Sequence, residues 1–321
     1  MKEGQASITV VVPNYNQRKL LRACLRSLRR QTHPCRVLVV DDGSEDGSAS
    51  MVEQDFPEFR CLRLSSNVGF AAAANAGMRR VETEFTALLN NDAEADPEWI
   101  AAGLRAFQRL PRHGMLASKM IDSRDCSRLD SAGDLYNRRG MPLKRGNGCP
   151  ASDFEQEAEV LGASGGAAFY RTSMLRRLGY FDESFHMYLE DVDLSLRARL
   201  AGYRCRFIPQ AVVYHLEAGS DPLRKPGDGP GVYYSPSRVY WITRNRWRLM
   251  WTYQPLSNFP WLALGWTKSA LFHLLKAGYL GSFLKGTAAG WAALPNDLGK
   301  RRRLFRHSRI SRSELWKLFR A

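Results

Sequence analysis

Short apolar runs alternate with amphipathic segments over residues 7–92. The runs are rich in β-branched residues, as in strands buried within a sheet, and the segments between them carry apolar residues at helical spacing. The predicted strands are Ile8–Val12, Val37–Val40, Cys61–Leu64 and Phe85–Leu89, and the predicted helices lie around Leu20–Leu28, Ser48–Asp55 and Phe70–Arg80. This alternation predicts an α/β fold whose parallel sheet is covered by helices on both faces.

The pattern is less regular after residue 92. Asp96 and Pro97 are predicted to open a helix that runs to about Leu110, with Asp96 as its N-cap. Further strands are predicted at Met115–Ile121, Val160–Tyr170, Tyr203–Ile208 and Val212–His215. Residues 122–157 show no periodicity and mix Asp, Arg, Gly and Ser, which indicates a long loop or an excursion from the sheet. Loops of this length are usually functional or mobile.

Three carboxylates, Glu190, Asp191 and Asp193, fall within four residues at the start of a predicted helix. Leu189, Val192, Leu196 and Leu200 recur at helical spacing, and Gly202 stands where the helix would end. The helix dipole favours an ionised carboxylate there, while neighbouring like charges oppose ionisation, a balance that suits a general base. The alternative is that these acids only cap the helix.

A polar loop follows each of the four predicted parallel strands. The loops are Pro13–Asn16, Asp41–Ser44, Ser65–Gly69 and Asn90–Asp92. Ligands of open α/β sheets bind beyond the carboxyl ends of the strands, so we expect the loops to form one polar, acidic site. No G-x-G-x-x-G follows the first strand and no G-x-x-x-x-G-K-[ST] occurs, which argues against a dinucleotide-binding Rossmann enzyme and a P-loop NTPase.

Small residues at Gly162–Gly166 allow close approach to the backbone. They fit either a wall against a ligand or tight packing within the sheet.

The six cysteines show no metal-type spacing and are predicted to be buried free thiols in a reducing compartment. The first apolar run, Ile8–Val12, is short and predicts a strand and not a signal peptide, which indicates a cytoplasmic protein.

Charge is concentrated at the C-terminal end of the chain. Residues 231–321 carry 16 Lys or Arg and 2 Asp or Glu, whereas residues 1–230 carry 31 and 30. Lys268, Lys276 and Lys285 interrupt the apolar stretch too often for a membrane span of about twenty apolar residues. Basic, tryptophan-rich amphipathic helices on an anionic membrane surface explain the composition. The alternative is that the helices cap the rest of the protein with solvated charges; nucleic-acid binding is not expected, because no recognised motif accompanies the charge.

The ordered motifs resemble those of glycosyltransferase family 2, and in particular its bacterial rhamnosyltransferase-like branch. The matching segments are Val12–Asn16, Val40–Ser44, Asn67–Phe70 with Asn75, Leu89–Asp92, Gly179–Glu183, Leu189–Leu194 and Tyr214–His215. Each is short, but the ordered set is specific and covers about residues 7–220. The resemblance implies a GT-A fold for residues 1–230, followed by a basic helical region over residues 231–321.

The resemblance also implies inverting transfer of a sugar from a nucleotide donor to a hydroxyl group. Asp191 matches the general base, and Glu190 and Asp193 shape its field or hold the acceptor. Asp92 matches the last residue of a D-x-D metal motif and His215 a histidine that can complete coordination of Mn²⁺ or Mg²⁺. Asn90 and Asn91 stand where an acidic residue often begins that motif, which leaves metal dependence open.

Other positions match the part of the family that binds the nucleotide. Pro13, Asn14 and Asp41 match residues that hold the base and ribose, and Asn67 and Asn75 lie beside the nucleotide. Asp42, Gly69, Asn91 and Gly165 are further candidates, with Asp42 capping its turn as the alternative.

The expected donor is dTDP-rhamnose or a UDP-sugar, and the expected acceptor is a lipid-linked or growing cell-surface saccharide. We expect the acceptor to meet the aperiodic region at residues 122–157. We expect the enzyme to lie on the inner face of the membrane. The rivals are a non-catalytic sugar-nucleotide-binding protein of the same fold, a nucleic-acid-binding protein and a nucleotidyltransferase, whose Gly-rich, Lys-bearing N-terminal signature is missing.

Overall fold

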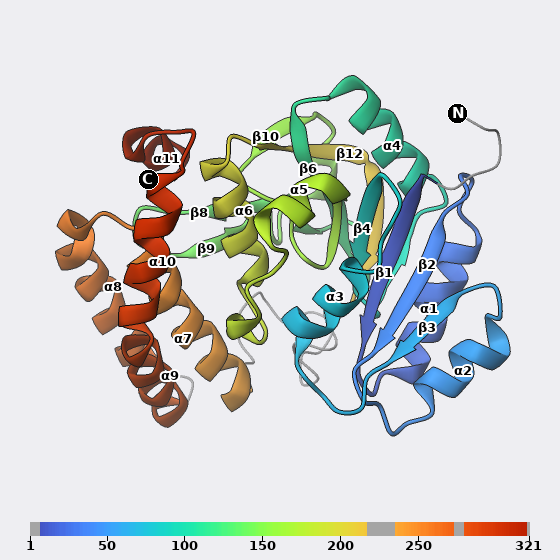
Figure 1. The fold of residues 1–321 in the computed structure, drawn as a ribbon, viewed down its shortest axis with the longest axis horizontal. Coiled ribbons are helices and arrows are strands. Elements are labelled where there is room, and N and C mark those ends of the chain that lie inside the picture. The colour runs from blue at the N-terminus through green and yellow to red at the C-terminus, as the bar shows by residue number, and fades with distance from the viewer. Residues whose placement is uncertain (1–6, 217–234, 273–278, 320–321) are drawn as a thin grey trace.

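A ten-stranded mixed sheet forms the centre of the protein in a computed structural model that describes residues 7–216, 235–272 and 279–319 (Figure 1). The strand order is β10-β12-β6-β11-β4-β1-β2-β3, and β5 and β7 pair with β12 and β6. The bounds of the eight strands on this path are β1 Ile8–Asn14, β2 Arg36–Asp41, β3 Arg60–Arg63, β4 Phe85–Leu89, β6 His113–Asp122, β10 Ala158–Val160, β11 Ala167–Arg171 and β12 Arg204–His215.

The predicted parallel sheet is present in the first half of the chain. Strands β1, β2, β3 and β4 pair in parallel, with Val12 opposite Val39 and Val10 opposite Ala87. Strand β11 then runs antiparallel to both β4 and β6, and β6 pairs in parallel with β12. The polar loops after β1 to β4 therefore lie along one edge of the sheet, next to the antiparallel strand β11.

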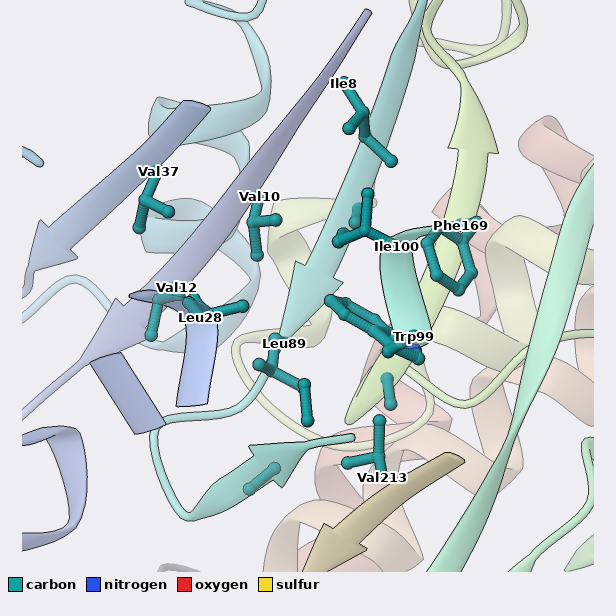
Figure 2. Close-up of a cluster of buried hydrophobic side chains, with 14 of the residues drawn as sticks. Ile8, Val10, Val12, Leu28, Val37, Leu89, Trp99, Ile100, Phe169 and Val213 are labelled. Atoms are coloured by element: carbon teal, nitrogen blue, oxygen red, sulfur yellow. The ribbon is translucent and has the colours of Figure 1, made fainter. Parts of the chain in front are cut away.

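Helices cover both faces of this sheet. One face packs on α1 (Arg18–Arg29), α2 (Ser48–Asp55) and α4 (Trp99–Arg109), and the other on α3 (Phe70–Met78), α5 (Thr172–Leu178) and α6 (Glu190–Leu200). Side chains alternate along β1, so Val10 and Val12 join the first hydrophobic cluster and Val11 the second. Figure 2 shows part of the first cluster, where Trp99 and Ile100 of α4 pack with Phe169 and Val213 of the sheet. The two clusters hold the strand ends in fixed positions.

Residues 122–157 form an excursion with short strands and not a long loop, so the first of the two alternatives was wrong. This region contains β7 (Leu129–Ser131), β8 (Asp134–Tyr136), β9 (Pro142–Lys144) and a 3₁₀ turn at Ala151–Asp153. Each strand has three residues, which is too short to show a period of two in the sequence. Strand β5 (Ala93–Ala95) was missed for the same reason.

Three other predicted boundaries differ from the structure. The strand predicted over Val160–Tyr170 is two strands, β10 and β11, separated by the glycine-containing loop. The strands predicted at Tyr203–Ile208 and Val212–His215 form a single irregular strand, β12, whose register shifts between Ile208 and Val212. Helix α4 begins at Trp99 after Glu98, and Asp96 instead accepts a hydrogen bond from the Glu98 N–H at 2.9 Å.

The C-terminal region folds into helices that pack against the sheet domain (Figure 1). These are α7 (Pro236–Tyr253), α8 (Phe259–Phe272), α9 (Leu280–Ala292), α10 (Leu294–Arg306) and α11 (Arg312–Leu318), with a 3₁₀ turn at Leu256–Asn258. A third hydrophobic cluster joins Val192 and Leu196 of α6 to Leu249 and Tyr253 of α7. The predicted division between residues 230 and 231 lies outside the described residues.

The prediction of buried thiols holds for only part of the cysteines. Cys24 and Cys205 are buried, Cys35 and Cys61 are half-buried, and Cys126 and Cys149 are exposed. The exposed pair lies in the region that lacked a readable pattern, where burial could not be inferred.

Candidate active site

A cavity of about 840 Å³ lies at the edge of the sheet where the four polar loops end. The sequence-predicted residues on its wall are Pro13, Asn14, Asp42, Asn67, Gly69, Asn91, Asp92, Gly165, Glu190, Asp191 and His215. The loops therefore converge as expected from the carboxyl ends of parallel strands. Asp41, Asn75 and Asp193 are not on the wall.

Asp41 and Asn14 form a hydrogen-bonded pair between the ends of β1 and β2. Asn14 Nδ2 donates to Asp41 Oδ1 at 3.2 Å, and the Ser44 N–H donates to Asp41 Oδ2 at 3.1 Å. Asn91 Nδ2 in turn donates to Asn14 Oδ1 at 2.8 Å. Asp41 is buried behind Asn14, so it orients the residues on the cavity wall.

Asp42 holds the loop that precedes α3. Its two carboxylate oxygens accept the Val68 N–H at 2.8 Å and the Gly69 N–H at 3.0 Å. Burial raises the pKa of Asp42, and these two hydrogen bonds oppose that shift. Asp42 therefore clamps a second loop and also lines the cavity. The alternative that Asp42 caps its own turn was wrong, because Asp41 is the residue that accepts the Ser44 N–H there. Gly69 has φ +90°, and a Cβ there would lie 2.3 Å from His186 Nδ1, so only glycine fits.

Asn75 is buried inside the protein, where it connects α3 to the segment that contains Phe181 and Glu183. Its amide donates to the Phe181 carbonyl at 2.9 Å and to Glu183 at 3.0 Å, and its oxygen accepts the Phe181 N–H at 3.0 Å. These bonds join α3 to the 3₁₀ turn Glu183–Phe185. The prediction that Asn75 contacts the nucleotide therefore needs correction, because its hydrogen-bonding groups face the protein interior.

The loop that leads into α6 has an unusual backbone. His186, Tyr188 and Leu189 all have positive φ, between 63° and 70°, a region that non-glycine residues rarely adopt. Asn245 of α7 stabilises this loop, because its Nδ2 lies 3.0, 2.9 and 2.8 Å from the carbonyl oxygens of Phe185, Met187 and Tyr188. Sequence reasoning missed Asn245, which lies in the basic region without any motif pointing to this loop.

Glu190 and Asp191 stand at the start of α6 and on the cavity wall. Asp191 Oδ2 accepts the Gly165 N–H at 2.8 Å, and Asp191 Oδ1 accepts the Val192 N–H at 2.8 Å. Burial raises the pKa of Asp191, and the backbone hydrogen bonds oppose this shift. Burial and the neighbouring Asp191 charge raise the pKa of Glu190 well above its usual value. A carboxylate with a raised pKa and a fixed orientation can accept a proton from a bound hydroxyl group.

Asp193 is absent from the cavity wall, which does not fit the expectation that it holds the acceptor. Its charge raises the pKa of Glu190, as expected if Asp193 shapes the field around the base. Asp193 is fully buried and bonds to Arg197 at 2.8 Å, Lys300 at 2.6 Å and the Tyr253 hydroxyl at 2.8 Å. Burial opposes ionisation, but the charges of Lys300 and Arg197 lower the pKa of Asp193. Asp193 joins α6 to α7 through Tyr253 and to α10 through Lys300.

The predicted metal-binding residues meet at the end of β4. Asp92 Oδ1 lies 3.2 Å from His215 Nε2, and Asn90 Nδ2 lies 3.5 Å from the same nitrogen. On the other side of the ring, His215 Nδ1 lies 2.9 Å from Asp130 Oδ2, and Lys144 Nζ lies 2.6 Å from Asp130 Oδ1. Burial would lower the pKa of His215, but Asp92 and Asp130 raise it to about 10.

These side chains fit a divalent ion in their chemistry. Carboxylate and amide oxygens are ligands for Mn²⁺ and Mg²⁺, and imidazole nitrogen is a ligand for transition-metal ions. The buried Asn90 Oδ1 accepts no hydrogen bond from any described residue. A carboxylate behind a histidine, as Asp130 lies behind His215, is the usual support of a metal ligand. Within residues 7–216, 235–272 and 279–319, no three His, Cys, Asp or Glu side chains are placed to hold a metal by themselves.

The C-terminal helices complete the cavity. The wall residues that they contribute are Arg238, Val239, Ile242, Thr243 and Arg246 of α7 and Ser269 and Phe272 of α8. The hairpin β8–β9 adds Asp134, Leu143 and Lys144. The sequence led us to expect that residues 122–157, which contain this hairpin, meet the acceptor, but it named no residue there and did not place the C-terminal helices at the site. No helix in the described ranges is both long and apolar enough to cross a bilayer.

Parallel strands with amide and carboxylate loops on one side of a cavity, and a buried carboxylate pair on the other, define an α/β protein with a polar ligand-binding site at the carboxyl ends of its strands. The sequence model of Glycosyl transferase family 2 matches residues 9–179. The protein belongs to this family.

Comparison with individual proteins agrees with the family. N-acetylglucosaminyl-diphospho-decaprenol L-rhamnosyltransferase of Mycobacterium tuberculosis is 30% identical over 274 residues, which cover 76% of this chain and 88% of the relative. The structure of Staphylococcus aureus TarS with UDP-GlcNAc aligns with a TM-score of 0.57 at 21% identity, over 93% of this chain and 90% of TarS. The mannosyltransferase PcManGT of Pyrobaculum calidifontis, with GDP-Man and Mn²⁺, aligns at 0.54 and 18% identity, over 94% and 86%. The predicted GT-A fold is confirmed.

Proposed function

We propose that this glycosyltransferase moves a sugar, with inversion at the anomeric carbon, from a nucleoside diphosphate to a hydroxyl group of a lipid-linked saccharide. The observation that carries the proposal is the position of Asp191 on the cavity wall, where the backbone N–H groups of Gly165 and Val192 fix its carboxylate. A sugar hydroxyl is a weak nucleophile, so a base must take its proton as it attacks. Asp191 is that base.

The nucleotide lies in the half of the cavity made by the loops after β1 to β4. Asn14, oriented by Asp41 and Asn91, and the Asp42-clamped loop at Asn67–Gly69 supply amide and backbone groups for the base and ribose. Asp92, His215 and the Asn90 amide oxygen would hold a divalent ion. Such an ion, when bound, neutralises the charge that develops on the leaving diphosphate.

The acceptor lies in the other half of the cavity, bounded by β8–β9, α6, α7 and α8. Arg238 and Arg246 give this wall positive charge, and Ile242 and Phe272 give it apolar surface. A lipid diphosphate requires both kinds of contact. The 30% identical relative is named for an N-acetylglucosaminyl-diphospho-decaprenol acceptor and L-rhamnose transfer, which supports a lipid-diphosphate saccharide as acceptor and dTDP-rhamnose as the first donor to test.

Peripheral binding to the cytoplasmic face of the membrane follows from a lipid-linked acceptor. Leu271 and Phe272 of α8 are 53% and 42% exposed, and Leu284 and Trp291 of α9 are 47% and 48% exposed. Lys268 and Lys285 lie on the same two helices and would attract an anionic surface. Flotation with vesicles containing phosphatidylglycerol tests this, and full recovery of the protein away from the vesicles contradicts it.

A non-catalytic sugar-nucleotide-binding protein is the second candidate function. Asn90 and Asn91 favour it, because they leave Asp92 as the one acidic residue of the metal motif. Intact Glu190 and Asp191 on the cavity wall favour the enzyme.

The deciding experiment offers the purified protein dTDP-rhamnose, UDP-GlcNAc, UDP-glucose and GDP-mannose, with Mn²⁺ or Mg²⁺, and a synthetic N-acetylglucosaminyl diphosphate with a short prenyl chain. Nucleotide release that depends on acceptor, with an inverted anomeric proton in the product by NMR, supports the proposal. Donor binding without turnover on this acceptor or on extracted lipid-linked saccharides supports the non-catalytic candidate, and retention of configuration contradicts the role given to Asp191.

A further inference from the structure

Three buried side-chain oxygens near Asp191 have no hydrogen-bond partner among the described residues: Asp134 Oδ2, Glu190 Oε2 and the Tyr170 hydroxyl. These residues are only 5%, 4% and 1% exposed. Asp134 and Glu190 line the same cavity as Asp191, whereas Tyr170 is not on the wall. Burial and the charges of Asp191, Asp134 and Glu190 raise the pKa of Tyr170. Buried polar groups in native proteins are nearly always hydrogen-bonded, so the two carboxyl oxygens of wall residues, Asp134 Oδ2 and Glu190 Oε2, are placed to bind a molecule in the cavity.

Asp134 is held rigidly at this position. Its backbone N–H donates to the Gly162 carbonyl at 2.9 Å, at the start of the loop that carries Gly165. The β8–β9 hairpin lies between the sheet and the C-terminal helices (Figure 1), where the Tyr136 ring packs edge-on against Phe319 at 4.9 Å and Gln254 Nε2 donates to the Asn137 carbonyl at 3.2 Å. Asp134 therefore belongs to the Asp191 side of the cavity and not to the loops after β1 to β4.

The chemistry of this cluster fits a hydroxyl group. Burial and the Asp191 charge raise the pKa of Asp134 well above its usual value, and burial with the Asp191 and Asp134 charges does the same to Glu190. Protonated carboxyl groups donate one hydrogen bond and accept others. A sugar hydroxyl can do both at once, whereas an anion such as phosphate would be repelled by the neighbouring Asp191.

We propose that Asp134 and Glu190 form a subsite that holds a hydroxyl group of the acceptor saccharide, next to the hydroxyl that Asp191 deprotonates. This inference rests on the proposed function and adds a residue that selects the acceptor. The base must touch the acceptor, so polar groups that share its wall are placed to bind the same sugar ring. The subsite rejects a saccharide that lacks the matching hydroxyl, because the carboxyl groups would then remain buried and unpaired.

The test compares wild type with Asp134→Ala and Asp134→Asn, and uses Asp153→Ala as the control, since Asp153 is an exposed residue of the same region and is absent from the cavity wall. The acceptors are the synthetic N-acetylglucosaminyl diphosphate and its monodeoxy analogues. Acceptor KM and kcat are measured for each protein, together with donor KM and the slow hydrolysis of donor by water. Hydrolysis and the thermal unfolding midpoint show whether each variant is folded and binds donor.

We expect Asp134→Ala to raise the acceptor KM about tenfold or more while donor KM and donor hydrolysis stay within twofold. Asp134→Asn, which can still donate and accept, should recover most of this loss. One deoxy analogue should be poor for wild type and no worse than its parent for Asp134→Ala. An unchanged acceptor KM in Asp134→Ala, or an equal loss of donor hydrolysis, overturns the inference. If wild type transfers to no acceptor, the proposed function fails first, and the inference falls with it.

Discussion

Lys300 of α10 donates a hydrogen bond to Asp193 of α6 at 2.6 Å across 107 residues of sequence. Lys300 also bonds to Asp182 at 2.7 Å, and Arg248 of α7 pairs with Asp297 of α10 at 3.0 Å. This network of buried charges fixes the helix that carries Asp191. The basic C-terminal region is therefore part of the active-site scaffold, independently of its proposed role in membrane binding.

Lys300→Met should destabilise the protein strongly. It leaves Asp193, which is fully buried, with Arg197 as its remaining cationic partner. Removing one member of a buried ion pair costs about 3 kcal/mol or more of the free energy of unfolding. Urea unfolding measures this change. Lys317→Met, at an exposed lysine of α11, is the control, and equal unfolding midpoints for the two variants would contradict the role of Lys300.

Asn245→Asp should reduce turnover more than donor binding. The carboxylate would face three carbonyl oxygens in place of the amide that now donates to the Phe185–Tyr188 loop. The positive-φ backbone before Glu190 would then lose its support, and we expect kcat to fall roughly 10- to 100-fold. Asn296→Asp, at an exposed asparagine of α10, serves as the control. An Asn245→Asp enzyme with wild-type kcat would show that this loop does not position Asp191.

The stability of Glu190→Gln relative to wild type should increase as pH rises. The folded state raises the pKa of Glu190 above its unfolded value of 4.5, so it binds a proton that the unfolded state releases. The stability that this residue contributes is complete below about pH 4.5 and is lost as pH increases. Thermal unfolding of wild type and variant from pH 4.5 to 8 should show a difference that grows with pH. A difference that shrinks with pH would mean that Glu190 is ionised and stabilised in the folded state.

Asp130→Asn should lower the affinity for the metal ion without removing a metal ligand. Asp130 Oδ2 orients His215 through Nδ1, which leaves Nε2 facing Asp92. Loss of such a supporting carboxylate reduces metal affinity about 10- to 100-fold. Reactivation of chelator-treated enzyme by Mn²⁺ measures this shift, with Asp153→Asn as the control. If chelation leaves wild-type turnover intact, the metal-binding role of Asp92 and His215 is wrong.

The early part of the fold and half of the site are readable from sequence. The strands from Ile8 to Leu89 are long, apolar and separated by regular helices, so their polar ends could be assigned to one edge of a sheet. Strands of three residues, such as Asp134–Tyr136, have too few positions to show alternation. Asp130 and Asp134 lie in such short strands and were therefore not predicted as site residues.

Contacts between residues that are distant in the sequence could not be predicted either. Asp193 looked like its neighbour Asp191, and only the folded structure shows that a helical residue two positions away points to Lys300 and Tyr253. Asn245 contacts carbonyl groups 57 to 60 residues earlier in the chain. Backbone carbonyls carry no signature in the sequence, so no pattern could reveal this contact.

The most direct test of the central claim is nucleotide release by wild type and Asp191→Asn, with the donor and acceptor that wild type uses. Asparagine keeps the shape and can still accept the Gly165 N–H, but it cannot take a proton. We predict that kcat falls at least about 10²-fold while donor affinity, measured by calorimetry, stays within threefold. Turnover by Asp191→Asn within a few-fold of wild type would contradict the assignment of Asp191 as the base.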